Sequence, residues 1–176
     1  MPNARLTDPQ ALDDLLLYRL NRVVSTAGTM VMRLCEGRYG ITRREWRALA
    51  WLGREDGVLS SLLAERIQLD RTRTSRAVTS LQAKGLLHRR SGEADRREVR
   101  LTLSVAGRAL YDELMPQVRA INRELLSVLR PAEAQGLDAA LGRLQQRAER
   151  LAAQSPWPKA DRRRGGRGLG TRVDAG

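Results

Sequence analysis

Apolar residues recur every three or four positions in three long segments of the chain. These segments cover residues 16–34, 110–128 and 137–151. The spacing places an apolar stripe along one side of a helix, so we predict a long helix in each segment. The first segment carries a second stripe through Leu17, Val24 and Val31. A helix that is apolar on two sides packs against two surfaces, and we expect a second subunit to supply one of them.

Residues that favour helix ends bracket these segments. We expect Pro9 to open the first helix and the segment 36–40, which contains two glycines, to end it. Ser104 is suited to cap the second helix. Pro116 lies inside that helix and should bend it or interrupt its hydrogen bonding, whereas Pro131 suits the first turn of the third helix.

Shorter elements fill residues 41–103. The stretch TRREWRALAWLGRE predicts an amphipathic helix, SSLLAERI predicts a short helix, and the turn QLD leads to a further helix that stops at Gly85. The segments LLHRR and EVRLTLS flank a turn, and the second alternates apolar and polar residues, so we predict a two-stranded ribbon. A helix, a tight turn, a helix and a β-hairpin in this order form a winged helix-turn-helix.

The helix that begins in the stretch DRTRTSRAV is poor in residues that can be buried. Asp70 is a good N-cap for it. Three apolar residues of this helix should pack on three of the preceding helix: Ala77, Val78 and Leu81 on Leu63, Ala64 and Ile67. The side chains left facing outward are Arg71, Thr72, Arg73, Ser75, Arg76 and Thr79.

An outward face of this kind suits a recognition helix, whose donors bind base edges and phosphates in the major groove of DNA. The plainer alternative is a solvated charged face. Such a face usually mixes acidic with basic residues, and this helix has no acidic residue after Asp70. We therefore favour DNA binding.

The whole chain is strongly basic, which agrees with this interpretation. Its net charge is +12 over 176 residues, and lysine occurs only at positions 84 and 159, so nearly all of its basic residues are arginine. This positive charge suggests a polyanionic partner, nucleic acid first and an anionic membrane surface second. Genomic base composition is an alternative explanation for the many arginines. No apolar run is long enough to span a bilayer, no signal-peptide pattern is present, and the single cysteine suits a reducing cytosol, so we expect a cytoplasmic protein.

One long stretch resembles a known family. The sequence LLAERIQLDRTRTSRAVTSLQAKGLLHRRSGEADRREVRLTLSVAGRAL, above all ADRREVRLTLS with its D-x-R wing followed by L-T, resembles the MarR family of winged-helix regulators. The similarity extends from about Leu12 to Leu151. It implies a mainly α fold with a small β-hairpin wing, and an intertwined homodimer held by the first and last helices. It also implies a dyad-symmetric site in double-stranded DNA, usually overlapping the regulator's own promoter.

The resemblance assigns roles to individual residues as well. It implies that Arg97 is the wing arginine that enters the minor groove and that Asp95 holds its guanidinium group by an ion pair. Arg96, between them, completes the predicted set of DNA contacts. Two residues depart from the family pattern, because Thr74 stands where an apolar residue is usual and Gln68 where a turn glycine is common. The sequence therefore does not predict the geometry of this turn.

These observations divide the chain into three parts. We predict a helical dimerisation domain from residues 8–40 and 104–154, and a winged helix-turn-helix domain from residues 41–103. Residues 155–176 are rich in proline, glycine and arginine, so we expect a disordered basic tail.

Aromatic and basic residues near the junction of the two domains are candidates for binding a small effector: Tyr18, Arg19, Arg22, Trp46 and Trp51. Aromatic walls with an arginine can hold an aromatic carboxylate. The segment LLYRLNRVVSTAG…RLCEGRYGITRREWRAL is also similar to repressors of nicotinate-type aromatic catabolism within the family, which implies a hydroxylated pyridine or benzene carboxylate. In the alternative interpretation the tryptophans belong to the core and the arginines are merely solvated.

The sequence therefore predicts a dimeric regulator, most simply an autoregulatory repressor that a small aromatic acid releases from its operator. A redox regulator acting through Cys35 is an alternative, although a packed cysteine beside Glu36 is the simpler interpretation. A charge-driven, non-specific nucleic-acid-binding protein is another. We expect no enzyme, metal site or cofactor, because the sequence offers no nucleophile–base pair or phosphate loop and His88 is its only histidine.

Overall fold

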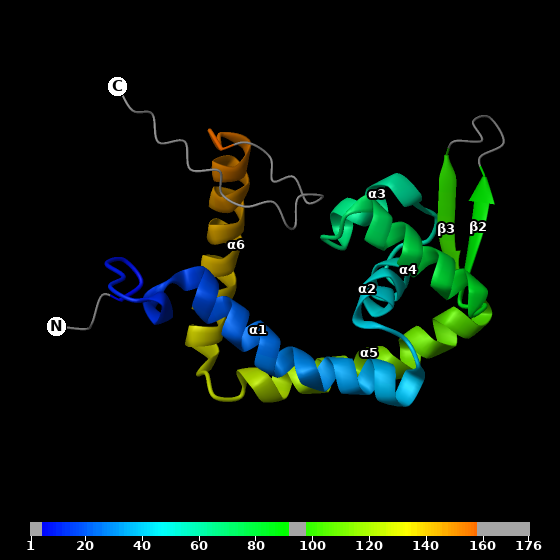
Figure 1. The fold of residues 1–176 in the computed structure, drawn as a ribbon. Helices are drawn as coiled ribbons and strands as arrows, with labels where there is room; N and C mark the ends of the chain where they lie inside the picture. The colour runs from blue at the N-terminus through cyan, green and yellow to red at the C-terminus, as the bar shows by residue number, and fades with distance from the viewer. Residues whose placement is uncertain (1–4, 92–97, 158–176) are drawn as a thin grey trace, which may run out of the picture. The chain divides into compact units, whose positions relative to one another are not determined.

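Figure 1 shows the fold of the chain in a computed structural model, which describes residues 5–91 and 98–157. The chain divides into two compact units, the first ending at Val128 and the second beginning at Leu129. The helices of the first unit are α1 (Leu16–Met32), α2 (Arg43–Leu52), α3 (Ser60–Arg66), α4 (Arg71–Ala83) and α5 (Val105–Leu126). Its strands are β1 (Val58–Leu59), β2 (Leu87–Ser91) and β3 (Val99–Leu103). The second unit contains α6 (Pro131–Ala153).

The first helix begins later than predicted, and its last turns are wider than those of an α-helix. Pro9 does not open it, because the carboxylate of Asp14 accepts hydrogen bonds from the backbone amides of Gln10 and Ala11, both at 3.1 Å. These bonds stabilise a separate 3₁₀ turn, η1 (Leu12–Asp14), and α1 begins only at Leu16. At its other end, α1 widens into a π-helical turn, η2 (Arg33–Arg38).

The remaining predicted helix ends are confirmed, including the end of the first helix within residues 36–40. Gly40 follows η2 with a φ of 62°, a left-handed conformation that glycine adopts without strain. The hydroxyl of Ser104 accepts a hydrogen bond from the backbone amide of Gly107 at 3.0 Å and so caps α5. Pro131 is the first residue of α6. α5 continues as one α-helix through Pro116.

The winged region is confirmed as well, with one strand more than predicted. β2 and β3 pair in antiparallel register from Leu87 opposite Leu103 to Ser91 opposite Val99. β1 pairs with the other edge of β3, so the sheet has three strands in the order β1-β3-β2. The two-stranded ribbon was an incomplete prediction, because a strand of two residues is too short to show a period-2 pattern.

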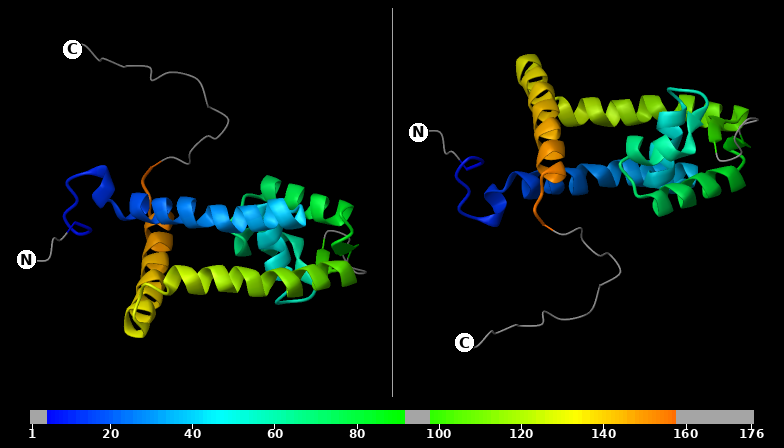
Figure 2. Two further views of the ribbon diagram at one scale, coloured as in Figure 1. Left: turned by 90° about the horizontal axis from the view of Figure 1, so that it is seen from below. Right: turned by 90° about the horizontal axis from the view of Figure 1, so that it is seen from above.

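The core lies in this region and under the first half of α5. Its fully buried large side chains include Ile41, just before α2, and seven leucines of α2, α3, α4, the sheet and α5: Leu49, Leu52, Leu63, Leu81, Leu87, Leu101 and Leu114. α1 and α5 run in opposite directions (Figure 2). The core thus fixes α3 and α4 on the sheet, as a winged helix-turn-helix requires.

The three periodic segments form helices as predicted, but much of their apolar surface stays exposed in the single chain. On α1 the exposed residues include Leu17, Leu20, Val23, Val24 and Met30, and on α6 they include Leu137, Leu141, Leu144 and Leu151. α6 has no buried residue. Apolar stripes of this extent on two helices are typical of a surface that another chain covers.

Candidate nucleic-acid interface

The start of α4 is fixed by Asp70. Its carboxylate accepts a hydrogen bond from the backbone amide of Arg73 at 2.8 Å, which makes Asp70 the N-cap that the sequence predicts. The guanidinium group of Arg73 lies 3.2 Å from the same carboxylate. The N-cap of α4 therefore also binds the side chain of Arg73, from the first turn of the same helix.

The two faces of α4 are arranged as predicted. Ala77, Val78 and Leu81 are buried, as are the three residues of α3 and the following turn on which we expected them to pack. All six predicted DNA-contacting residues of α4 are exposed: Arg71, Thr72, Arg73, Ser75, Arg76 and Thr79. α4 thus presents to solvent a face of arginines and hydroxyls without a carboxylate.

The two departures from the family pattern both fit the turn. Thr74 is buried, and its hydroxyl donates to the backbone carbonyl of Asp70 at 2.9 Å, so no polar atom is left without a partner. Gln68 has a φ of 54°, the left-handed conformation in which a glycine is usual. The turn between α3 and α4 keeps this backbone conformation with a glutamine in it.

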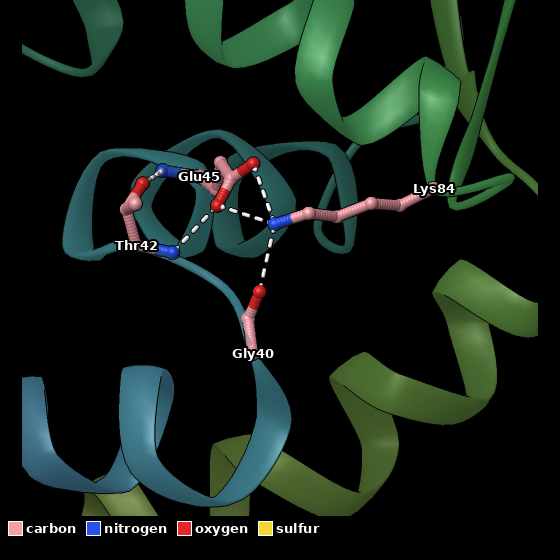
Figure 3. Close-up of polar contacts among 4 residues, drawn as sticks. All are labelled: Gly40, Thr42, Glu45 and Lys84. Atoms are coloured by element: carbon pink, nitrogen blue, oxygen red, sulfur yellow. Dashed lines mark hydrogen bonds and ion pairs between the residues drawn. The ribbon is translucent and has the colours of Figure 1, made fainter.

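A buried carboxylate holds the far end of α4 against α2. Lys84, just after α4, directs its ammonium group to Glu45 Oε1 at 2.9 Å, to Glu45 Oε2 at 3.0 Å and to the carbonyl of Gly40 at 2.7 Å (Figure 3). Glu45 also accepts from the backbone amide of Thr42, while its own amide donates to the Thr42 hydroxyl at 3.2 Å. This is a capping box at the start of α2.

The charge of Glu45 is well compensated. Burial raises the pKa of its carboxyl, but hydrogen bonds from Ser80, from the Thr42 backbone and from Lys84 outweigh burial, and the pKa lies below its ordinary value. Sequence analysis missed the contact between Lys84 and Glu45 because the two residues are 39 positions apart. Two signals were present in the sequence: Thr42 and Glu45 have the spacing of a capping box, and Lys84 is one of two lysines in an arginine-rich chain.

The predicted wing residues Asp95, Arg96 and Arg97 lie outside the described residues. The strands that lead to them are basic and exposed at His88, Arg89 and Arg90 of β2 and at Arg100 of β3. The guanidinium group of Arg100 donates to the carbonyl of Gly57 at 3.2 Å. The described part of the hairpin thus extends the basic surface beyond α4.

The predicted effector residues do not gather in one place. Arg19 and Arg22 line an open groove of about 790 Å³, together with Val23, Met30 and Leu125. Tyr18, Trp46 and Trp51 do not line it. Trp46 is buried in the core, where its ring stacks on Tyr111 with centroids 6.4 Å apart. The ring of Trp51 lies instead under the guanidinium groups of Arg54 and Arg66, at 5.0 and 5.4 Å.

Cys35 is fully buried in the core, as the simpler interpretation of the sequence predicted. Burial and the nearby carboxylate of Glu36 raise the pKa of its thiol to about 11, although Arg43 opposes the shift. The thiol therefore stays protonated and shielded at neutral pH. Within residues 5–91 and 98–157, no group of histidine, cysteine and acidic side chains could hold a metal ion. No helix in the same ranges is long and apolar enough to cross a membrane.

Comparison with known proteins places these features in context. A sequence profile described as MarR family matches residues 39–98. The chain is similar to a transcriptional regulator of the MarR family from Silicibacter pomeroyi, with 30% identity and a TM-score of 0.67 over 76% of this chain and 90% of the other. No protein with a curated description matches the sequence.

Two further solved structures share the fold at lower identity. BpsR of Bordetella bronchiseptica, described with the regulation of its DNA binding by 6-hydroxynicotinic acid, is 22% identical with a TM-score of 0.71 over 78% of this chain and 98% of that one. The PcaV transcriptional regulator of Streptomyces coelicolor, in complex with its natural ligand, is 21% identical with a TM-score of 0.67. The matched lengths are 80% of this chain and 99% of PcaV.

Proposed function

Because the chain belongs to the MarR family of transcriptional regulators, we propose that it is a dimeric, sequence-specific DNA-binding regulator that represses its own gene in the cytoplasm. The observation that carries this proposal is the outward face of α4. Six exposed polar side chains lie on it, and α4 contains no acidic residue after its cap Asp70. Such a face can enter a major groove and meet both base edges and phosphates.

The residues of this face take different roles in the proposal. Arg73 is already paired with Asp70, so it suits a phosphate contact in a fixed position. Arg71 and Arg76 are exposed and suit bidentate contact with guanine or phosphate, and the hydroxyls of Thr72, Ser75 and Thr79 suit either base edges or phosphates. On the resemblance to the family alone, we propose that Arg97 enters the minor groove, that Asp95 holds its guanidinium group by an ion pair, and that Arg96 also contacts DNA.

A second copy of the chain is part of the proposal. The exposed Leu17, Leu20 and Val24 of α1 and the exposed leucines of α6 support it, since these apolar side chains face solvent in a single chain. Two winged domains related by a two-fold axis would bind two half-sites about 10 bp apart centre to centre. The operator should therefore show dyad symmetry.

We also propose a small aromatic carboxylate, such as a hydroxylated pyridine or benzene carboxylate, as the effector. Arg19 and Arg22 support this choice, because two guanidinium groups beside the apolar Val23 and Met30 suit a carboxylate on a ring. That BpsR is regulated by 6-hydroxynicotinic acid is a further reason to test this class first. Tyr18, Trp46 and Trp51 remain predicted contacts that this groove does not include. The effector would release DNA by favouring a dimer in which the two α4 helices no longer match the half-sites.

The test is fluorescence anisotropy with duplexes tiled across the DNA that flanks the gene, and with an arbitrary duplex for comparison. We expect one dyad-symmetric tile to bind at least about a thousandfold more tightly than the arbitrary duplex. Arg71→Ala should lose most of that preference, whereas Arg123→Ala, which removes an exposed arginine from the last turn of α5, should keep it. Adding 6-hydroxynicotinate or 4-hydroxybenzoate should then release the bound tile.

Equal binding to every tile and to sheared genomic DNA would overturn the proposal and support a charge-driven, non-specific binder instead. Release of the tile by peroxide, abolished by Cys35→Ser, would favour the redox alternative. The burial and raised pKa of the Cys35 thiol argue against that result.

A further inference from the structure

A second basic feature lies beside α4, on a helix that the predicted DNA contacts do not include. A groove of about 420 Å³ lies between the start of α2 and the side of α4 that carries Arg73, Arg76 and Ser80. Arg44 lines it from α2, and Arg73 and Arg76 line it from α4. Thr42, the N-cap of α2, stands at its edge. Three arginines from two helices thus surround one hollow.

Two of the four charged residues that line this groove have ion-pair partners within the protein. The carboxylate of Glu45, which also lines the groove, binds Lys84 through both oxygens. Arg73 is paired with Asp70 at 3.2 Å. Among the described residues, no carboxylate forms an ion pair with Arg44 or Arg76. Within the described residues, the groove therefore has two guanidinium groups without an ion-pair partner.

The position of the groove indicates what it binds. Arg76 belongs both to the groove and to the outward face of α4, so the groove is continuous with the surface that we propose enters the major groove. A helix in a major groove has a sugar–phosphate backbone on each side of it. The amino end of α2, with its positive helix dipole, faces the same hollow through Thr42.

We propose that the groove between α2 and α4 binds a phosphate of the DNA backbone, held between Arg44 and Arg76. This inference rests on the proposed function and adds a DNA-binding residue on α2, outside the recognition helix and the wing. The contact is independent of sequence, so it fixes how α4 sits along the groove without reading a base. Lys84 and Glu45 act as positioning residues, because they hold the start of α2 at a fixed distance from α4.

The experiment measures binding to an arbitrary duplex of about 30 bp, long enough for two half-sites about 10 bp apart, at several salt concentrations. Arg44→Gln should weaken binding about tenfold at low salt. It should also reduce the slope of log affinity against log salt by about 0.9 for each subunit bound, as expected for one lost phosphate contact. Arg44→Lys, which keeps the charge, should retain the wild-type slope.

The control is Arg123→Gln, which removes one positive charge from an exposed position at the end of α5. It should leave the slope unchanged. Because Arg44 is exposed, we expect Arg44→Gln to unfold at the wild-type urea concentration, which separates loss of DNA binding from loss of the fold. The ratio of affinities for the specific tile and the arbitrary duplex should also stay at its wild-type value.

Three outcomes would overturn the inference. If Arg44→Gln has the slope and affinity of Arg123→Gln, the groove holds no phosphate, while specific binding by the wild type leaves the proposed function standing. If Arg44→Gln changes the preference for the specific tile with no change in slope, Arg44 reads a base edge. If the wild type binds no duplex at all, the inference and the proposed function fail together.

Discussion

Lys84 holds the end of α4 against α2 through a single buried carboxylate. Glu45 is 2% exposed as a residue, whereas the Lys84 side chain is 36% exposed. Removing the lysine leaves the carboxylate buried without its counter-charge, which is the costly way to break an ion pair. Because the lysine is partly solvated, we expect Lys84→Met to lower the free energy of unfolding by about 2 kcal/mol, less than for a fully buried pair.

Urea unfolding measures this change, and a double variant provides its control. Lys84→Met combined with Glu45→Gln removes the uncompensated charge and should recover at least half of the lost stability. An Lys84→Met protein as stable as the wild type would show that the network contributes nothing to the docking of α4.

The same carboxyl gives a pH dependence with a definite sign. Burial opposes ionisation of Glu45, but its hydrogen bonds to Ser80, Thr42 and Lys84 set its pKa below the ordinary value of 4.5. The unfolded chain therefore takes up this proton at a higher pH than the folded chain does. The contribution to stability is present above pH 4.5 and is lost as the pH falls through the lowered pKa. In urea titrations from about pH 6 to pH 3, Glu45→Gln should lose less stability than the wild type, and parallel curves would contradict this assignment.

Residues adjacent in sequence were predictable, whereas distant pairs were not. Asp70 as N-cap and the inward and outward faces of α4 followed from local pattern, because a helix fixes which residues share a side. The ion pair between Lys84 and Glu45 depends on how α2 packs against α4, which no local pattern encodes. The same holds for Arg44 in the groove beside α4.

At the scale of elements, the first turn of α5 lies unusually close to the chain that enters β2. A Cβ atom added to Gly107 would lie 1.9 Å from the backbone oxygen of Leu86, which cannot rotate away. The hydroxyl of Ser104 also donates to the carbonyl of Gly85 at 2.6 Å. The contact between α5 and the base of the hairpin therefore depends on a glycine at position 107.

We expect Gly107→Ala to lower the free energy of unfolding by about 2–3 kcal/mol, the cost of forcing backbone apart in a packed region. Gly136→Ala is the matched control, since Gly136 lies inside α6 with open space around its added Cβ. This control should raise helix stability by up to about 1 kcal/mol, because alanine favours a helix more than glycine does. Thermal or urea unfolding measures both changes. We expect the free energy of unfolding to fall for Gly107→Ala and to rise for Gly136→Ala.

Element prediction succeeded where a pattern repeats and failed where it does not. α1, α5 and α6 each contain several turns, so the 3.6-residue period of their apolar residues could be recognised in the sequence. β1 has two residues and acquires its strand geometry only by pairing with β3. The separate turn before α1 depends on hydrogen bonds from Gln10 and Ala11 to Asp14, which outweighed the preference of Pro9 for a helix start.

At the scale of the whole molecule, the exposed apolar stripes bear on the proposed dimer. Leu137, Leu141 and Leu144 recur on α6 with 40–42% of each residue exposed, and the helix has no buried residue. Apolar side chains at this spacing are stabilised only when a partner surface covers them. The same periodicity that predicts the helix in the sequence thus predicts an interface that a single chain leaves incomplete.

We therefore expect the wild type to sediment at twice the chain mass of 19.7 kDa. Leu141→Glu should weaken self-association by about a hundredfold or more, because burying each leucine contributes roughly 1.5–3 kcal/mol and a symmetric dimer loses two. The control is Gln146→Glu, which introduces the same charge at an exposed position of α6 outside the leucine stripe. A dissociated Leu141→Glu protein should also lose its preference for dyad-symmetric DNA, since one winged domain contacts only one half-site. If Leu141→Glu and Gln146→Glu both sediment as the wild type does, α6 is not in the interface and another helix must supply it.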